Sequence, residues 1–159
     1  MRNRRKGGRR RTEMVPADGL SQSRSEPEPV SLAAILMLER HPDEVAFVWS
    51  LIHDVMCSGL WLWHEDNFMH AMHLLSFARF RLILLDATFA PRLSLRTLIK
   101  RVQTAAPATP IILRVPPEEL PAHPEARVYG VAAAVPKGTG GPTEQAIRRL
   151  LGIGQDRAP

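Results

Sequence analysis

The sequence predicts an α/β fold in which helices cover both faces of a doubly wound sheet of five parallel strands. Two observations lead to this fold class. From about residue 31 onwards, short apolar runs of strand length alternate with helix-length segments, and this alternation is typical of parallel βαβ units. The first run, Leu32 to Leu38, is also apolar without interruption, as expected for a strand covered by helices on both faces.

The expected elements follow one another in order along the chain. The five expected strands cover residues 32–38, 60–65, 80–86, 109–115 and 130–135. Pro42 suits the first turn of the first helix, and Asp66 and Ser94 carry side chains that cap helix N-termini. Gly59 and Gly152 suit helix ends. One buried helix face is indicated by apolar residues at i, i+3, i+4 and i+7, namely Leu95, Leu98, Ile99 and Val102.

Five strands with connections of this length fit the flavodoxin-like type of doubly wound sheet. In such open sheets, ligands and chemistry lie outside the carboxyl ends of the strands. The stretch RLILLDATFA brings a single carboxylate, Asp86, to the end of the third expected strand. Lys137 follows the fifth strand, and Glu39 and Arg40 follow the first. We therefore expect these side chains to lie at the same edge of the sheet.

Charge divides the chain into a folded domain and two tails. Residues 1–30 hold eight Lys or Arg against four Asp or Glu, while the remainder holds thirteen against twelve. The basic segment is poor in apolar side chains, so we expect it to be disordered, with a domain at 31–153 and a short tail at 154–159. The arm from Arg2 to Arg11 could bind nucleic acid through its phosphates. The alternatives are a solubilising leader or a start at Met14.

Several classes of protein are disfavoured by composition. A single cysteine, Cys57, excludes an internal disulfide framework. No apolar run approaches the roughly 20 residues that span a membrane, so we expect a cytoplasmic protein. The glycines near Lys137 follow the lysine, which is the wrong order for a nucleotide-binding loop. His64, His70 and His73 lack an evident further ligand for zinc.

In element order and in its strand-end residues, the chain resembles the response-regulator receiver domains of two-component signalling over about residues 33–152. The resemblance implies that Asp86 is the phosphoacceptor and that Lys137 contacts the phosphoryl group. Glu39 and Arg40 stand where the family has an acidic pair. One acid is thus kept, and the other is replaced by a cation.

This replacement bears on the cofactor that the resemblance implies. The Mg²⁺ of the family would be held here by Glu39, Asp86 and the carbonyl of Thr88. Arg40 removes one ligand and adds a fixed positive charge, which makes Mg²⁺ possible but doubtful as a cofactor. The guanidinium either substitutes for the charge of the metal or locks Asp86 in an ion pair.

Three further positions depart from the family. Val115 stands where the family has a hydroxyl at the end of the fourth strand, and a shift of one residue would place Arg114 there instead. Ala134 stands in the place of the switch aromatic. Four prolines between Pro116 and Pro124 exclude a continuous helix after the fourth strand. This chain therefore lacks the hydroxyl and the aromatic residue that the family uses for its standard conformational switch.

Large aromatic residues predict a further surface. We expect Trp49 to pack inside, whereas Trp61 and Trp63 point to one face of the second strand because side chains alternate along a strand. If that face is incompletely covered, it is a surface for a second copy of the chain or for another partner.

We expect a stand-alone, non-enzymatic receiver-like protein of a two-component phosphorelay. Its expected partners are a histidine kinase or a phosphotransfer protein, and an unknown output protein that it contacts directly. A second copy of the chain is a further possible partner. The alternative is a phosphorylation-independent interaction module, tethered to nucleic acid by the basic arm. A haloacid-dehalogenase-type phosphatase is disfavoured because it needs a second aspartate two residues after Asp86, where this chain has Thr88.

Overall fold

A computed structural model describes residues 30–55, 59–119 and 129–153 of the chain. The strands are β1 (Val30–Ser31), β2 (Ala34–Leu38), β3 (Trp61–Glu65), β4 (Ala78–Arg79), β5 (Leu82–Asp86), β6 (Ile111–Val115) and β7 (Ala133–Pro136). The helices are α1 (Pro42–Val55), α2 (Phe68–Phe77), α3 (Leu95–Ala105) and α4 (Gly140–Leu151). Strands β2, β3, β5, β6 and β7 correspond to the five strands that the sequence predicts, and the short strands β1 and β4 are additional.

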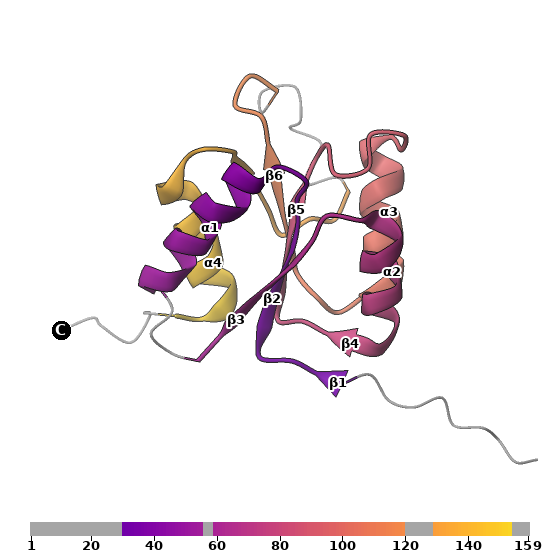
Figure 1. Ribbon diagram of the computed structural model, residues 1–159, viewed down its shortest axis with the longest axis horizontal. Helices are drawn as coiled ribbons and strands as arrows, with labels where there is room; N and C mark the ends of the chain where they lie inside the picture. Colours follow the sequence, from indigo (N-terminus) through magenta and orange to yellow (C-terminus); the bar gives the residue numbers. More distant parts are fainter. Residues whose placement is uncertain (1–29, 56–58, 120–128, 154–159) are drawn as a thin grey trace, which may run out of the picture.

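The main sheet has five parallel strands in the order β3-β2-β5-β6-β7. Helices α1 and α4 lie on one face of this sheet and α2 and α3 on the other (Figure 1). The predicted fold class, a doubly wound parallel sheet, is therefore confirmed. The carboxyl ends of the strands meet at one edge of the sheet, and this edge positions the site.

The core has two parts, one on each face of the sheet. Alternate residues of the central strands enter different parts, because successive side chains of a strand point to opposite faces. Under α2 and α3 the buried residues include Leu36, Leu75, Leu85, Leu98 and Leu113. Under α1 and α4 they include Met37, Val48, Leu84, Ile112 and Ile147.

Side-chain capping sets the beginning of two helices. Ser94 Oγ accepts a hydrogen bond from the Thr97 amide at 3.3 Å and begins α3, as predicted. Helix α2 is capped by Asn67 rather than by the predicted Asp66. Asn67 Oδ1 accepts from the amides of Met69 and His70, at 2.9 and 3.2 Å. The cap lies one position later than predicted because α2 begins at Phe68 rather than at Asn67.

A short second sheet joins the start of the described chain to the domain. Strand β1 pairs in parallel with β4, with Val30 opposite Ala78. The amide of Leu32 donates to the carbonyl of Arg79 at 2.8 Å. This pairing lies near the amino ends of the main strands, far from their carboxyl edge (Figure 1).

The prediction for Trp49 is wrong. Its side chain is 52% exposed, because α1 buries Val48 and Ile52, four residues apart, and the neighbouring position faces outward. Trp61 and Trp63 do share a face, and both are largely exposed on the edge strand β3. Trp63 Nε1 donates to Glu65 Oε1 at 3.1 Å along that face.

Some predictions concern residues outside the described ranges: the disorder of the basic arm and the conformation around Pro121 and Pro124. The start of the proline segment is described. Pro116 accepts a hydrogen bond from the Glu119 amide at 2.9 Å, which closes a turn after β6. Within the described ranges, no helix is long and apolar enough to cross a membrane.

Candidate functional site

Four charged side chains gather at the carboxyl edge of the sheet, each at or near the end of a different strand. Glu39 follows β2, Asp86 ends β5, Arg114 lies in β6 and Lys137 follows β7. In each strand, the residue two positions earlier belongs to the core under α1 and α4; these residues are Met37, Leu84, Ile112 and Val135. All four charged side chains therefore point to the same face of the sheet.

Glu39 is one of the two fully enclosed acids of the site. Its Oε1 accepts hydrogen bonds from the amides of Arg40 and His41 at 2.9 and 3.0 Å, and Oε2 lies 2.8 Å from Lys137 Nζ. Burial alone would raise the pKa of Glu39, but the ammonium of Lys137 and the hydrogen bonds from His41 outweigh it. Together they lower the pKa from 4.5 to about 2. Glu39 is thus a fixed negative charge inside the protein.

Asp86 is held by Thr88, which lies in the turn directly after β5. The Thr88 amide donates to Asp86 Oδ1 at 3.1 Å, and the Thr88 hydroxyl donates to Oδ2 at 2.8 Å. Lys137 Nζ approaches Oδ1 at 3.2 Å. The carboxylate is oriented by three donors and its side chain is 0% exposed. A reagent can reach it only after the surrounding side chains have moved.

Lys137 connects the two acids. Its ammonium lies within 3.2 Å of both Glu39 and Asp86 and is 11% exposed. Its amide donates to the Val115 carbonyl at 2.8 Å, which continues the sheet beyond β7. Gly138 then adopts a φ of +70°, in the left-handed region that glycine enters without strain. The turn directs the chain into α4 and leaves Lys137 over the carboxyl edge.

Arg114 contributes a second buried cation. Its side chain is 1% exposed, and Nη2 forms an ion pair with Glu44 Oε2 in the first turns of α1. Nη1 lies 3.8 Å from Glu39 Oε2. Five charged groups thus meet here, and the two cations Arg114 and Lys137 nearly balance the three carboxylates.

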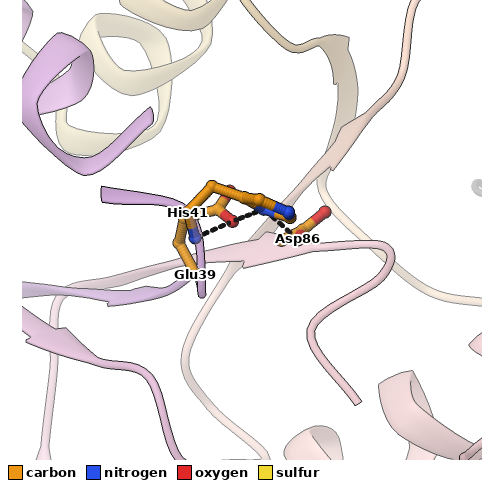
Figure 2. A group of neighbouring side chains, drawn as sticks. All are labelled: Glu39, His41 and Asp86. Atoms are coloured by element: carbon orange, nitrogen blue, oxygen red, sulfur yellow. Dashed lines mark hydrogen bonds and ion pairs between the residues drawn. The ribbon is translucent and has the colours of Figure 1, made fainter. Parts of the chain in front are cut away.

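His41 closes the site from the start of α1. Its Nδ1 lies 2.8 Å from Glu39 Oε1 and 4.0 Å from Asp86 Oδ2 (Figure 2). Ligand atoms of these three residues lie within 4.8 Å of one another, and this is the one potential metal-binding group found among the described residues. The ring is 63% exposed, so His41 lies between the buried carboxylates and solvent.

The structure brings together three of the predicted site residues: Glu39, Asp86 and Lys137. Thr88 contacts Asp86 through its amide and its hydroxyl, whereas the sequence predicts a role for its carbonyl. Arg40 is exposed, and within the described ranges its side chain forms no ion pair with an acid. It lines an open groove of about 540 Å³ beside Phe68 and other residues of the neighbouring loops.

Of the two residues considered for the hydroxyl position, Val115 and Arg114, only Arg114 lies on the face of the sheet that carries Asp86. Val115 belongs to the core under α2 and α3, on the face away from Asp86. Arg114 is paired with Asp86 in the sheet. It is the residue that a shift of one position from Val115 places at the end of the fourth predicted strand. Ala134 is half-buried against the α2 and α3 core. The site therefore has no aromatic residue at that strand position.

Sequence reasoning missed His41 and Glu44 as members of the site. The sequence holds a signal for both residues. They follow the strand-end acid Glu39 within five residues, and they lie about one helical turn apart. His64 was considered only as a zinc ligand, yet its Nε2 lies 2.7 Å from the Glu39 carbonyl. That contact helps to fix the backbone from which the site projects.

Comparison with known proteins supports the fold. A receiver domain of a sensor histidine kinase from Pseudomonas aeruginosa has a TM-score of 0.60 and 16% identity over 75% of this chain and 97% of that one. Its structure holds a magnesium ion in the active-site cleft. A signal receiver domain from Bacteroides fragilis has a TM-score of 0.64 and 10% identity, covering 76% and 96% of the two chains. The chain has the fold of response-regulator receiver domains.

Another structure with this fold carries a modified aspartate. A response regulator from Burkholderia pseudomallei carries a phosphorylated aspartic acid and a calcium ion, with a TM-score of 0.58, 17% identity and coverage of 74% of this chain and 65% of that one. No family model and no curated protein matches this sequence. The receiver fold is therefore combined with a strongly diverged sequence.

Proposed function

We propose that the chain is a receiver-like signalling protein in which Asp86 accepts a phosphoryl group from a histidine kinase or a phosphotransfer protein. The observation that carries the proposal is the approach of Lys137 Nζ to within 3.2 Å of Asp86 Oδ1 at the carboxyl edge of a receiver fold. A lysine at this point can neutralise charge on a transferred phosphoryl group. The phosphorylated aspartate in the related fold supports the same chemistry.

In the proposed step, an oxygen of Asp86 attacks the phosphorus of a phosphohistidine. The P–N bond breaks, and its electron pair leaves with the imidazole of the donor. Thr88 fixes the carboxylate through its amide and hydroxyl, and Lys137 offsets the repulsion between two anions. His41 lies between Asp86 and solvent with its side chain 63% exposed, so in this proposal it swings outward to admit the donor.

The residues of the site fit Mg²⁺ poorly. Glu39 Oε1 already accepts from the Arg40 amide and from His41, and Oε2 faces Lys137. Both oxygens of Asp86 likewise have protein donors. A proton on His41 Nδ1, which the 2.8 Å approach to a carboxylate favours, blocks that nitrogen as a ligand. Mg²⁺ also prefers oxygen ligands in near-ideal octahedral geometry, so no step is assigned to it.

In this proposal the chain is a substrate of phosphotransfer in the cytoplasm rather than an enzyme, and its output passes through contacts with a partner protein. Where receivers carry a helix after the fourth strand, this chain has a proline-rich segment that starts with the turn at Pro116. We therefore expect its partner-binding surface to differ from that of proteins with this helix, because prolines disfavour a continuous helix.

Intact-mass spectrometry after incubation with acetyl phosphate and Mg²⁺ tests the proposal. We expect one phosphoryl adduct on the wild type and none on Asp86→Asn. The matched control is Asp43→Asn, which changes an exposed acid in the first turn of α1 and should leave the adduct unchanged. An adduct that survives in Asp86→Asn would assign phosphorylation to another group, and no adduct on the wild type with either acetyl phosphate or phosphoramidate would refute the proposal.

A second candidate is a phosphorylation-independent interaction module. It is favoured by the closed set of ion pairs, because Lys137 and Arg114 already neutralise the buried acids. The same experiment separates the two functions. An unreactive but folded wild type would leave the interaction module as the function of this fold.

A further inference from the structure

Arg114 has hydrogen-bonding capacity that the protein does not use. Its side chain is 1% exposed, and only Nη2 has an acceptor, the carboxylate of Glu44. Nε and Nη1 are buried and lack a hydrogen-bond acceptor within the described ranges. Burying a polar donor without a partner is unfavourable, because the donor loses its hydrogen bonds to water and gains none in return. A guanidinium with two unused donors inside a protein therefore points to a ligand that supplies acceptors.

The residue that carries the unused donors is the sheet neighbour of the proposed phosphoacceptor. Arg114 and Asp86 are paired in adjacent strands, whose backbones lie about 4.8 Å apart, and both side chains point toward α1 and α4. Nη1 is 3.8 Å from Glu39 Oε2, too far for a hydrogen bond but within the same group of charges. The ion pair with Glu44 holds the guanidinium from the outer side.

A phosphoryl group on Asp86 would supply the missing acceptors. It brings three oxygens and additional negative charge to a site whose carboxylates already outnumber the cations Lys137 and Arg114. A planar guanidinium presents its donors in a fork that matches two phosphoryl oxygens, whereas an ammonium acts as a point charge. Lys137 and Arg114 approach from the two strands that follow β5 in the sheet.

We propose that Arg114 takes the charge-neutralising role of a divalent cation, so that Asp86 accepts a phosphoryl group without a metal ion. This inference rests on the proposed function and adds to it that the reaction is independent of Mg²⁺. It assigns the role predicted for Arg40 to a different arginine, since Arg40 is exposed and Arg114 is buried at the site.

Phosphoramidate is a suitable donor for the test because its P–N bond resembles that of phosphohistidine. The nitrogen of phosphoramidate first takes a proton from water; an Asp86 oxygen then forms the new P–O bond, the P–N bond breaks, and the nitrogen leaves with its electron pair as ammonia. Arg114 and Lys137 keep their protons throughout and bind the transferred oxygens.

The experiment measures the rate of phosphorylation of the full-length chain by intact mass, once with Mg²⁺ and once with EDTA. We expect the wild-type rate to be the same within about twofold, since removal of Mg²⁺ leaves the charge at the site unchanged. Arg114→Gln should be slower by roughly a hundredfold, the usual cost of a lost donor to a reacting anion. Arg114→Lys should recover part of the rate. The matched control is Arg148→Gln, which breaks an ion pair on α4 and should leave the rate unchanged.

The outcomes separate this inference from the proposed function. Phosphorylation of the wild type only with Mg²⁺ would overturn the role of Arg114 and keep Asp86 as acceptor, whereas no phosphorylation in either buffer would overturn the proposed function itself. A metal-independent rate that Arg114→Gln leaves intact would also overturn the inference. The wild-type comparison needs no variant, and circular dichroism checks that Arg114→Gln is folded. If Arg114→Gln does not fold, Glu44→Gln is used instead. This variant keeps Arg114 but removes its ion pair with Glu44, and it should slow the reaction in EDTA.

Discussion

At the scale of single residues, Glu39 carries a charge at a place where burial opposes it. The side chain is 1% exposed, and its ionised form persists because Lys137 and the amides of Arg40 and His41 compensate for the lost water. Breaking such an arrangement on one side leaves an unpaired charge. Glu39 is therefore both a part of the site and a source of pH-dependent stability.

The pH dependence follows from the lowered pKa of Glu39. A group whose pKa is lower in the folded than in the unfolded chain stabilises the fold above the unfolded value, and this stability is lost as pH falls through the folded value. The pKa falls from 4.5 to about 2, so we expect roughly 3 kcal/mol at neutral pH to disappear between about pH 5 and pH 2. Urea unfolding of wild type and Glu39→Gln across this range measures it.

In Glu39→Gln the free energy of unfolding should be lower at pH 7 and should depend less on pH below 5. Glu118→Gln is a suitable control because Glu118 is exposed at the turn after β6. Parallel pH profiles for wild type and Glu39→Gln would show that Glu39 is not the source of the acid sensitivity.

Which site residues could be predicted depends on how each one reaches the site. Glu39, Asp86 and Lys137 stand at strand ends, and strand ends meet at one edge in any parallel sheet, so the sequence alone brings them together. His41 reaches the site through the path of the chain between β2 and α1. Arg114 depends on the side-chain alternation of β6, which a one-residue shift reverses. Register and loop path are tertiary properties, and no local pattern determines them.

At the scale of elements, the loop from β7 to α4 determines where Lys137 lies. Gly138 turns the chain with a φ of +70°, and two residues later α4 begins with two glycines. Gly140 lies close to α1, where an added Cβ would come within 3.4 Å of Leu51 Cδ1. Gly138 and Gly141 have open space around them, so substitutions at these two positions test backbone conformation without steric contact.

We expect Gly138→Ala to destabilise the fold by about 1 kcal/mol, because a residue with a Cβ pays that cost in the left-handed region. Gly141→Ala is the matched control. Gly141 lies in the first turn of α4 without a positive φ, so alanine should be neutral or stabilising by up to about 1 kcal/mol. Thermal and urea unfolding measure both. Equal effects of the two substitutions would contradict the argument from φ.

At the scale of the whole molecule, the charged site and the start of the described chain lie at opposite ends of the sheet. The charged site occupies the carboxyl edge, and the described chain begins with β1 near the amino ends of the strands (Figure 1). A segment that precedes Val30 is therefore attached on the side away from Asp86. Binding of nucleic acid by the arm Arg2–Arg11, if it occurs, would not need to displace any residue of the site.

This separation predicts different results for two truncations. Removing residues 1–29 leaves every described element and both parts of the core in place, so the melting temperature and the phosphorylation of Asp86 should remain those of the full chain. Removing residues 1–33 also deletes β1, its pairing with β4 and the hydrogen bond from Leu32 to Arg79. Each lost backbone hydrogen bond contributes about 1 kcal/mol, so the melting temperature should fall by several degrees. Differential scanning calorimetry measures both. A loss of stability already in the shorter deletion would show that residues 1–29 pack on the domain, and a loss of phosphorylation without a loss of stability would place them at the site.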